Sequence, residues 1–400
     1  RLAAYVVPSL DTEAARDETR QVREWKALHE LLYSAAGSEG FRENFAGWNS
    51  MYDGLPIPVE EMREWRDATI GLIDESRPRR VLEIGVGSGL ILSRVAPGCE
   101  SYWGTDVSEE AIRALRAQVG AVAEPTGRVE LRAQPAHDVT GLPRGFFDTV
   151  VVNSVAQYFP SAEYLRDVLR KAGALLAPGG SVFVGDVRNL RLLRCLRAAV
   201  ETRRGADPQD KQALRAAVER SVAWEGELLL DPDFFATLED FEADIHVKRG
   251  SFHNELTRYR YDVVLRKRAT TTPDGEGTPA PTGAEEIGWA DLGGLGALGA
   301  RLAGRPARLR VTGVPNARLA EDLTALCALG DSSRPAPADD TDPETLHALG
   351  ARHGYRVAVT WNGHADDGRL DVLFATGDTP LAVPYRPAGG FAHANRPAPF

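Results

Sequence analysis

The sequence predicts an α/β protein with a mostly parallel, doubly wound sheet. Between residues 79 and 188, apolar runs rich in Val and Ile alternate with helical patterns, which is typical of βαβ units with helices on both faces of a sheet. Two later apolar runs, at 243–250 and 258–267, are separated by a short connection and predict an antiparallel pair at the sheet edge. The 400 residues allow roughly two to three domains.

Each element of this sheet follows from its own pattern. Helices are predicted where apolar residues recur with helical spacing, and strands where apolar residues run together. The predicted helices are 13–36, 59–74, 109–119 and 162–176, and the predicted strands are 79–87, 102–106, 129–133, 146–154 and 179–187. Pro178, Gly179 and Gly180 are expected to form the turn between the last helix and the last strand.

A segment without apolar periodicity divides the chain. Residues 267–286 are rich in Thr, Pro, Gly and Glu, so they predict a linker that buries little surface. A weaker loop of the same kind spans 330–343. Helices at 316–329 and 343–353 and strands at 308–315, 355–361 and 368–376 then predict a small C-terminal α/β subdomain.

Composition excludes several classes of protein. Lys and Arg total 47 and Asp and Glu total 57, so the net charge of −10 argues against nucleic acid as a partner. The three cysteines, Cys99, Cys195 and Cys327, are too few and too widely spaced for a disulfide framework or a cysteine-based zinc site. No apolar run has the roughly 18 to 20 residues of a membrane span. We therefore expect a cytoplasmic protein with no membrane or metal partner.

The most informative segment is VLEIGVGSGL at 81–90, where an apolar strand ends in Gly85, Gly87 and Gly89. Glycines at such a bend let a ligand approach the backbone, and the following helix offers unpaired N–H groups. Asp106 ends the next strand, about 20 residues on, where a carboxylate accepts hydrogen bonds from ribose hydroxyls. The sequence therefore predicts a nucleoside-containing cofactor at this edge of the sheet.

The glycine spacing selects among such cofactors. A dinucleotide loop requires a sixth-position glycine, where this chain has Leu90, and the segment instead fits the E-x-G-x-G-x-G pattern of Class I methyltransferases. This favours S-adenosylmethionine over a nicotinamide cofactor. Glu83 is expected to support the loop or to attract the positive end of the cofactor, and Ala136 and His137, which follow the third strand, are expected near its adenine.

The chain resembles the N-methyltransferase domains embedded in nonribosomal peptide synthetases. The segments that carry the resemblance are ENFAGWNSMYDGLPIP (43–58), LEIGVGSGL (82–90), YWGTDVS (102–108), NSVAQYFPSAEYL (153–165), VGDVRNLRLL (184–193) and HNELTRYRYDVVL (253–265). The resemblance implies a Class I, Rossmann-like methyltransferase fold with an N-terminal helical lid at 13–75 and a core at 76–266. Residues 1–12 resemble a strand of the host adenylation domain, and 287–400 form the C-terminal subdomain.

The resemblance also implies a reaction. Such domains transfer a methyl group from S-adenosylmethionine to the α-amine of an aminoacyl thioester, which a peptidyl carrier protein holds on its phosphopantetheine arm. The expected partners are therefore that carrier protein and the host adenylation domain. Methyl transfer to a side-chain oxygen, sulfur or carbon is the nearest alternative reaction, and a non-catalytic methyltransferase-like insert is the alternative of another class.

Candidates for the chemistry follow the carboxyl ends of the strands, where ligands bind in open α/β sheets. We expect Asn153, Tyr158, Asp186 and Glu255 to be catalytic, with Asn153 also near the cofactor. Gln157, Arg188 and Trp48 are expected to bind the acceptor, and Tyr52 to cover the adenosine. Arg258, Tyr259 and Arg260 are expected to form a basic rim on the strand that follows Glu255.

Overall fold

The structure is a computed structural model that describes residues 42–121, 128–205, 210–268, 284–330, 341–377, 381, 385–390 and 392–398. The strand expected at 1–12, the helix expected at 13–36 and most of the predicted linker lie outside the described residues. Among the described helices, none combines the length and the apolar character that a membrane span requires.

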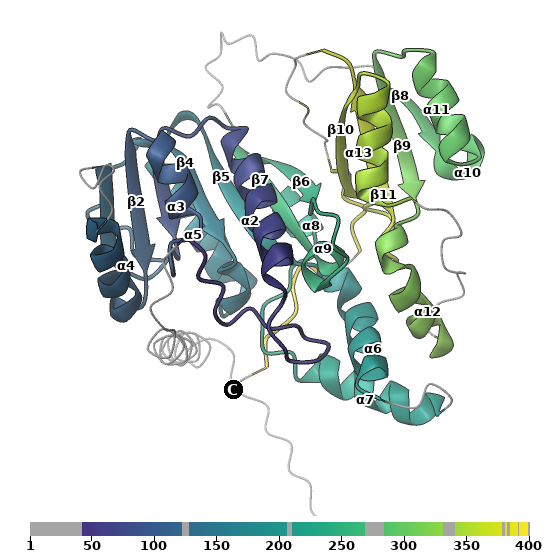
Figure 1. The fold of residues 1–400 in the computed structure, drawn as a ribbon, viewed down its shortest axis with the longest axis horizontal. Helices are drawn as coiled ribbons and strands as arrows, with labels where there is room; N and C mark the ends of the chain where they lie inside the picture. Colours follow the sequence, from purple (N-terminus) through teal and green to yellow (C-terminus); the bar gives the residue numbers. More distant parts are fainter. Residues whose placement is uncertain are drawn as a thin grey trace, which may run out of the picture.

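A seven-stranded sheet forms the larger part of the molecule (Figure 1). Its order is β3-β2-β1-β4-β5-β7-β6; β1 to β5 pair in parallel, and β7 runs antiparallel to β5 and β6. The order reverses between β1 and β4, and the reversed β7 gives the sheet the topology of the Class I methyltransferase fold. The strands are β1 (Arg80–Ile84), β2 (Ser101–Asp106), β3 (Val129–Ala133), β4 (Phe147–Asn153), β5 (Leu176–Arg188), β6 (Phe241–Val247) and β7 (Arg260–Lys267).

Helices cover both faces of this sheet, as the alternation of its apolar side chains requires. In β4, Val151 packs with one apolar cluster and its neighbours Val150 and Val152 pack with the other, because successive side chains of a strand point to opposite faces. The first cluster joins the sheet to α2 (Val59–Asp74), α3 (Leu92–Val95) and α4 (Glu109–Ala121). The second joins it to α5 (Ala162–Leu175), α6 (Leu193–Arg203) and α8 (Asp233–Ala236).

Several predicted boundaries differ from the observed ones. The predicted helix at 59–74 agrees with α2, but β5 begins at Leu176, before the expected turn. The strand expected from 258 begins at Arg260, because Asn254 caps a short helix, α9 (Glu255–Tyr259), by accepting hydrogen bonds from the N–H groups of Leu256 and Thr257. The helix α7 (Lys211–Ala223) was not predicted.

The C-terminal part is a smaller α/β unit with its own sheet. Its strand order is β10-β11-β9-β8, in which only β8 and β9 pair in parallel. The elements of this unit are β8 (Glu285–Gly288), α10 (Trp289–Leu292), α11 (Leu295–Ala303), β9 (Arg308–Val314), α12 (Ala320–Ala328), α13 (Pro343–Arg352), β10 (Arg356–Trp361) and β11 (Leu370–Ala375).

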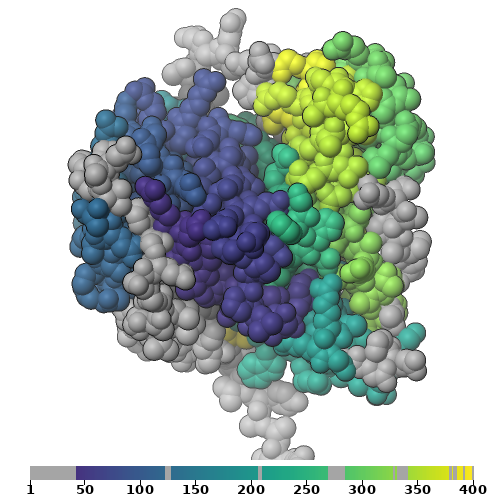
Figure 2. All heavy atoms as spheres, in the orientation of Figure 1, coloured from purple at the N-terminus to yellow at the C-terminus, as the bar shows by residue number. Residues whose placement is uncertain are grey.

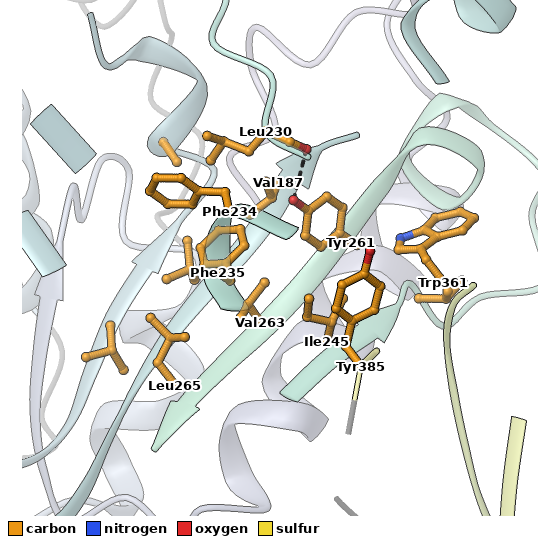
Figure 3. Close-up of a cluster of buried hydrophobic side chains, with 14 of the residues drawn as sticks. Val187, Leu230, Phe234, Phe235, Ile245, Tyr261, Val263, Leu265, Trp361 and Tyr385 are labelled. Carbon is orange, nitrogen blue, oxygen red and sulfur yellow. Dashed lines mark hydrogen bonds between the residues drawn. The ribbon is translucent and has the colours of Figure 1, made fainter. Parts of the chain in front are cut away.

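The two parts share one apolar core. Figure 3 shows Trp361 and Tyr385 of the C-terminal part beside Ile245 and Tyr261 of the larger sheet, and all four belong to one buried cluster. The Tyr261 hydroxyl donates a hydrogen bond of 3.0 Å to the carbonyl oxygen of Leu230, which satisfies the polar end of a buried ring. The C-terminal unit is therefore packed onto the larger sheet rather than tethered beside it.

A buried carboxylate also joins the parts. Asp322 of α12 accepts hydrogen bonds from Arg258, at 2.8 Å, and from the hydroxyl of Tyr259, both in α9. Arg258 is therefore not part of a solvent-facing basic rim, because its guanidinium is used inside the molecule.

Replacing Asp322 by Ala should destabilise the whole chain. The change removes the hydrogen-bonded carboxylate of the buried Arg258 guanidinium and leaves it only the exposed Glu321 at 4.0 Å, which costs on the order of 3 kcal/mol in the free energy of unfolding. Urea denaturation measures this loss. Glu321→Ala is the matched control, because the adjacent Glu321 side chain is 79% exposed, and it should change the free energy of unfolding by less than about 0.5 kcal/mol. Equal losses in the two variants would contradict the assigned link.

Candidate active site

A cavity of about 290 Å³ lies at the carboxyl ends of β1 and β4, where the strand order reverses. In Figure 2, the segment before α2 and α2 itself lie across this face of the molecule in purple. The cavity wall combines that N-terminal segment, the loop after β1, the ends of β4 and β7 and the start of α9. The polar and aromatic side chains of this wall include Trp48, Trp65, Glu83, Asn153, Ser154, Gln157, Tyr158, Glu227, Glu255 and Arg260.

A larger hollow of about 650 Å³ lies between α2, β6 and the C-terminal unit. No residue of the predicted glycine loop lines it. The smaller cavity is therefore the candidate active site, because it holds the loop and the ends of the strands that carry the predicted chemistry.

The glycine loop has the backbone conformation that its sequence predicts. Gly85, Gly87 and Gly89 have φ angles of 82°, 49° and 84°, in the left-handed region that favours glycine. Gly85 and Gly87 line the cavity, together with Ser88, whereas Gly89 lies in the turn beneath. A ligand in the cavity therefore meets backbone at this wall, as an amino acid and sulfonium group require.

Asp106 supports the loop from the end of β2. One carboxylate oxygen accepts a hydrogen bond of 3.0 Å from the N–H of Gly87, and the other accepts one of 2.9 Å from the N–H of Ser108. These bonds fix the carboxylate beside the glycine loop. Asp106 is buried and does not line the cavity.

Glu83 lies under the loop in an apolar setting. Burial raises the pKa of its carboxyl group to about 8, and the hydrogen bond from Tyr102 and the charge of Asp106 act in opposite directions on it. The Tyr102 hydroxyl donates to the Glu83 carboxyl at 2.6 Å. The Glu83 carboxyl group therefore holds its proton at neutral pH.

Two side-chain amides on the cavity wall have buried oxygen atoms without hydrogen-bond donors in the described part of the chain. These atoms are Asn153 Oδ1 and Gln157 Oε1, and both residues line the same cavity. Unpartnered buried acceptors are costly, so they indicate a ligand with N–H or O–H donors. S-adenosylmethionine and an amine acceptor both carry such donors, and the site therefore fits both.

Asp186 lies behind this wall rather than on it. The residue is fully buried, and its carboxylate accepts hydrogen bonds of 3.0 Å from Trp65 Nε1 and 3.0 Å from Ser154 Oγ. A third hydrogen bond comes from Arg260. Burial alone would raise the pKa of Asp186, but Arg260 and Lys248 hold it below its ordinary value. Asp186 does not reach the cavity, so direct contact with an acceptor, as predicted, does not fit this geometry.

Two other predicted residues, Arg188 and Tyr52, also lie away from the cavity. Arg188 forms a buried bidentate pair with Glu225, both bonds being 3.0 Å, so its guanidinium is not available to an acceptor there. This pair lowers the pKa of Glu225 to about 2 against the opposing effect of burial. Tyr52 packs beneath the guanidinium of Arg203, 4.0 Å from its ring centroid, because its segment turns toward α6.

The adenine-side residues follow β3 as predicted, but neither lines the cavity. The ring of His137 is exposed, and its Nδ1 atom lies 2.8 Å from the hydroxyl of Tyr164. Ala136 is partly buried against the core.

The remaining predicted side chains lie on the wall. Trp48 packs against Trp65 with ring centroids 4.6 Å apart, so the N-terminal segment closes one side of the cavity. Glu255 is buried at the start of α9 and accepts a hydrogen bond of 2.7 Å from the N–H of Met51. Burial raises the pKa of Tyr158 to about 12, so its hydroxyl keeps its proton at neutral pH.

Several wall residues were not predicted from the sequence, among them Trp65, Ser154, Glu227 and Arg260. Trp65 and Ser154 surround Asp186, Glu227 follows α7 in a loop, and Arg260 was placed on a rim rather than in a wall. Ser154 has a φ of 56°, a left-handed conformation that no local sequence pattern predicts. Glu227 had no signal either, because its loop joins the site only through the tertiary fold.

Gly185→Ala should lower the rate of methyl transfer. A Cβ atom there would lie 2.1 Å from Asn153 Oδ1 and 2.4 Å from the ring of Phe183, so the Asn153 side chain must leave its place. We expect the single-turnover rate at saturating S-adenosylmethionine to fall about tenfold, the equivalent of about one hydrogen bond, and the calorimetric affinity for S-adenosylmethionine to fall less. Gly120→Ala in α4 is the control, because its Cβ would meet nothing within 4 Å. An unchanged rate in a folded Gly185→Ala protein would contradict a contact between Asn153 and the acceptor.

Glu83 predicts a pH dependence of stability. The unfolded carboxyl loses its proton near 4.5 and the folded one near 8, so the folded state binds more protons between these values. The free energy of unfolding should therefore fall as pH rises from about 5 to about 8, by up to about 1.4 kcal/mol per unit of pKa difference. Glu83→Gln should remove this fall, and Glu130→Gln, in the more exposed part of β3, should keep it. Urea denaturation at several pH values in this range measures the free energy of unfolding. If that free energy changed with pH in the same way in Glu83→Gln and in wild type, the raised pKa of Glu83 would be contradicted.

Comparison with known proteins gives the family. Residues 82–182, which run from β1 into β5, match the family described as a methyltransferase domain. The chain is 43% identical to the probable nonribosomal peptide synthetase CymA of Salinispora arenicola, over 99% of this chain and 5% of that protein. It is 38% identical to chondramide synthase of Chondromyces crocatus, over 97% of this chain and 10% of that protein. It is 34% identical to enniatin synthetase of Fusarium oxysporum, over 65% of this chain and 9% of that protein.

The chain thus spans a tenth or less of the length of these three relatives. Among solved structures, the N-methyltransferase NodS of Bradyrhizobium japonicum, in complex with S-adenosyl-L-homocysteine, is similar at 16% identity and a TM-score of 0.37, over 55% of this chain and all of that one. The synthetase match runs along nearly the whole chain, and the methyltransferase match falls on its central strands. The chain therefore belongs to the S-adenosylmethionine-dependent methyltransferase domains found within nonribosomal peptide synthetases.

Proposed function

We propose that this domain methylates the α-amine of an aminoacyl thioester carried by a peptidyl carrier protein. The observation that carries the proposal is the pair of unpartnered amide oxygens, Asn153 Oδ1 and Gln157 Oε1, in one cavity with the glycine loop. A neutral primary amine has two N–H donors and one lone pair. Two neutral acceptors hold both donors and leave the lone pair free to attack.

The chemistry needs alignment more than activation. S-adenosylmethionine supplies a methyl group bonded to a positively charged sulfur. The task of the protein is to hold the nitrogen of an unprotonated amine in line with the bond between that methyl carbon and the sulfur. Amide oxygens suit this task, because a carboxylate at the same place would favour the protonated ammonium form.

Glu255 is our candidate for receiving the proton that the amine loses. Its carboxylate is buried on the cavity wall, and one of its oxygens is oriented by the Met51 N–H. Tyr158 serves as a hydrogen-bond donor and not as a base, because its pKa of about 12 keeps it protonated. Trp48 and Trp65 close the wall beside them and limit access of water.

The similarity to nonribosomal peptide synthetases supports a carrier protein as the partner that brings the acceptor. This chain spans a tenth or less of those synthetases, so the acceptor would arrive from a neighbouring domain. A host adenylation domain would select the amino acid and load the carrier. Binding energy from the phosphopantetheine arm would then orient the amine at the transition state, so a free amino acid should be a poor acceptor.

Mass spectrometry of an aminoacyl carrier protein tests the reaction. After incubation with S-adenosylmethionine, we expect one added methyl group, and fragmentation should place it on the α-nitrogen. A second methylation should be slower, because the product amine has one N–H left for two acceptors. A methyl group on a side-chain oxygen, sulfur or carbon, or efficient methylation of the free amino acid, would overturn the proposal.

Gln157→Leu should lower methyl transfer without equal loss of cofactor binding. Leu has about the size of Gln but lacks the whole amide group, including its unpartnered oxygen, so the single-turnover rate at saturating cofactor should fall about tenfold or more. The calorimetric affinity for S-adenosylmethionine should stay within about threefold. Thr360→Val is the matched control, because Thr360 Oγ1 is another unpartnered buried atom, in β10 and away from the cavity. A rate loss in Thr360→Val, or none in Gln157→Leu, would count against the assignment.

A further inference from the structure

Behind the cavity wall lies a row of buried charges that the reaction described above does not use. Asp262 of β7 and Lys248, which follows β6, are 4% and 1% exposed. They lie next to Asp186 and Arg260, so negative and positive side chains alternate from the larger hollow to the cavity wall. Burying four charges is costly unless each is held by the others.

Asp262 holds the backbone of Asp186. Its Oδ1 atom accepts a hydrogen bond of 2.8 Å from the Asp186 N–H. Asp186 has a φ of 66°, a left-handed conformation that a residue with a Cβ atom rarely adopts. The hydrogen bond to Asp262 compensates this conformation, because it satisfies the N–H group where β5 and β7 lose their regular register between Val184 and Val187.

Lys248 holds Asp262. Its ammonium group donates to Asp262 Oδ1 at 2.9 Å and to Thr69 Oγ1 at 3.2 Å, and it lies 3.8 Å from Asp186 Oδ1. The main chain of Lys248 is fixed in turn by the C-terminal unit, since Arg318 donates to its carbonyl oxygen at 2.7 Å. Arg318 is itself fully buried and pairs with Asp342.

The row ends on side chains that line the cavity. The Asp186 carboxylate binds Trp65, Ser154 and Arg260, and all three lie on the wall. Any movement of Asp186 therefore displaces three wall groups together, although Asp186 itself touches no ligand space.

We propose that Asp262 is a positioning residue for methyl transfer. Held by Lys248, it fixes the left-handed backbone of Asp186, so that the Asp186 carboxylate sets Trp65, Ser154 and Arg260 around the acceptor. The C-terminal unit contributes to this through the contact of Arg318 with Lys248. The inference rests on the proposed function, since it assigns these wall groups to the acceptor rather than to the cofactor.

Two variants of one residue test the proposal. Asp262→Ala removes the oxygen that accepts the Asp186 N–H, whereas Asp262→Asn keeps an oxygen of the same geometry. We expect Asp262→Ala to lower the single-turnover rate at saturating cofactor by about tenfold or more, because misorientation by a fraction of an ångström has this effect. Asp262→Asn should recover most of that rate, and the affinity of both variants for S-adenosylmethionine should stay within about threefold of wild type.

Asp371→Ala is the matched control for a lost buried carboxylate. Asp371 of β11 pairs with Arg310 at 2.7 Å and accepts a hydrogen bond of 3.1 Å from the N–H of Gly313, so its surroundings resemble those of Asp262. It lies in the second sheet and lines no part of the cavity. This variant should lower the melting temperature as Asp262→Ala does, while its single-turnover rate stays near that of wild type.

A second readout needs no turnover. The indole N–H of Trp65 donates to Asp186, so its resonance in a ¹⁵N-labelled protein, assigned by its absence in Trp65→Phe, reports the position of that carboxylate. It should shift in Asp262→Ala and stay near its wild-type position in Asp262→Asn and Asp371→Ala. If Asp262→Ala does not fold, Lys248→Met takes its place and is read by the single-turnover rate, which should fall about tenfold. The rate is the readout for this variant because the Lys248 ammonium lies 5.7 Å from the centroid of the Trp65 ring, and its loss would shift that resonance directly.

The outcomes separate this inference from the proposed function. A wild-type rate in folded Asp262→Ala, an Asn variant no better than the Ala variant, an unmoved Trp65 resonance or an equal rate loss in Asp371→Ala would overturn the positioning role. If instead the wild-type protein fails to methylate the α-amine while the Trp65 resonance moves as expected, the proposed acceptor is wrong. The positioning role is then tested on the acceptor that mass spectrometry identifies, with the same variants.

Discussion

The burial of the Asp186 carboxylate is the constraint on which the active site depends. A fully buried carboxylate is stable only when its oxygens are saturated and its charge is compensated, and here Trp65, Ser154 and Arg260 meet that demand. Each of these groups comes from a different element, namely α2, the end of β4 and β7. The demands of one charge therefore bring together the N-terminal helix and two strands around the cavity.

The same principle ties the C-terminal unit to the larger sheet. Asp322 is buried between Arg258 and Tyr259. Arg318 donates hydrogen bonds to the carbonyl oxygens of Lys248 and Gly250, which follow β6. These contacts accompany a shared apolar core, so the second sheet contributes to the stability of the first. A unit that the sequence presents as an appendage beyond a linker is thus part of the support of the site.

The conflict between burial and charge also explains the chemistry of the cavity. Glu83 has no cation beside it and keeps its proton, whereas Asp186 has two and loses it. Asn153 and Gln157 present neutral oxygens with no partner, which is a different solution, since a neutral acceptor costs less to leave open than a charge. The wall therefore offers acceptors to a ligand without holding an excess of buried charge.

The sequence by itself determined the parallel sheet, its antiparallel edge, the glycine loop and Asp106 beside it, because these depend on local periodicity and on spacing within one βαβ unit. It also gave the positions of Asn153, Gln157 and Glu255 near strand ends. Only the tertiary structure decided that Asp186 and Arg188 face buried partners, that Tyr52 turns away from the cavity and that Glu227 and Trp65 line it. Those outcomes depend on which charges meet across elements distant in the chain, such as Asp186 with Lys248, and pairing of that kind leaves no periodic trace in a single sequence.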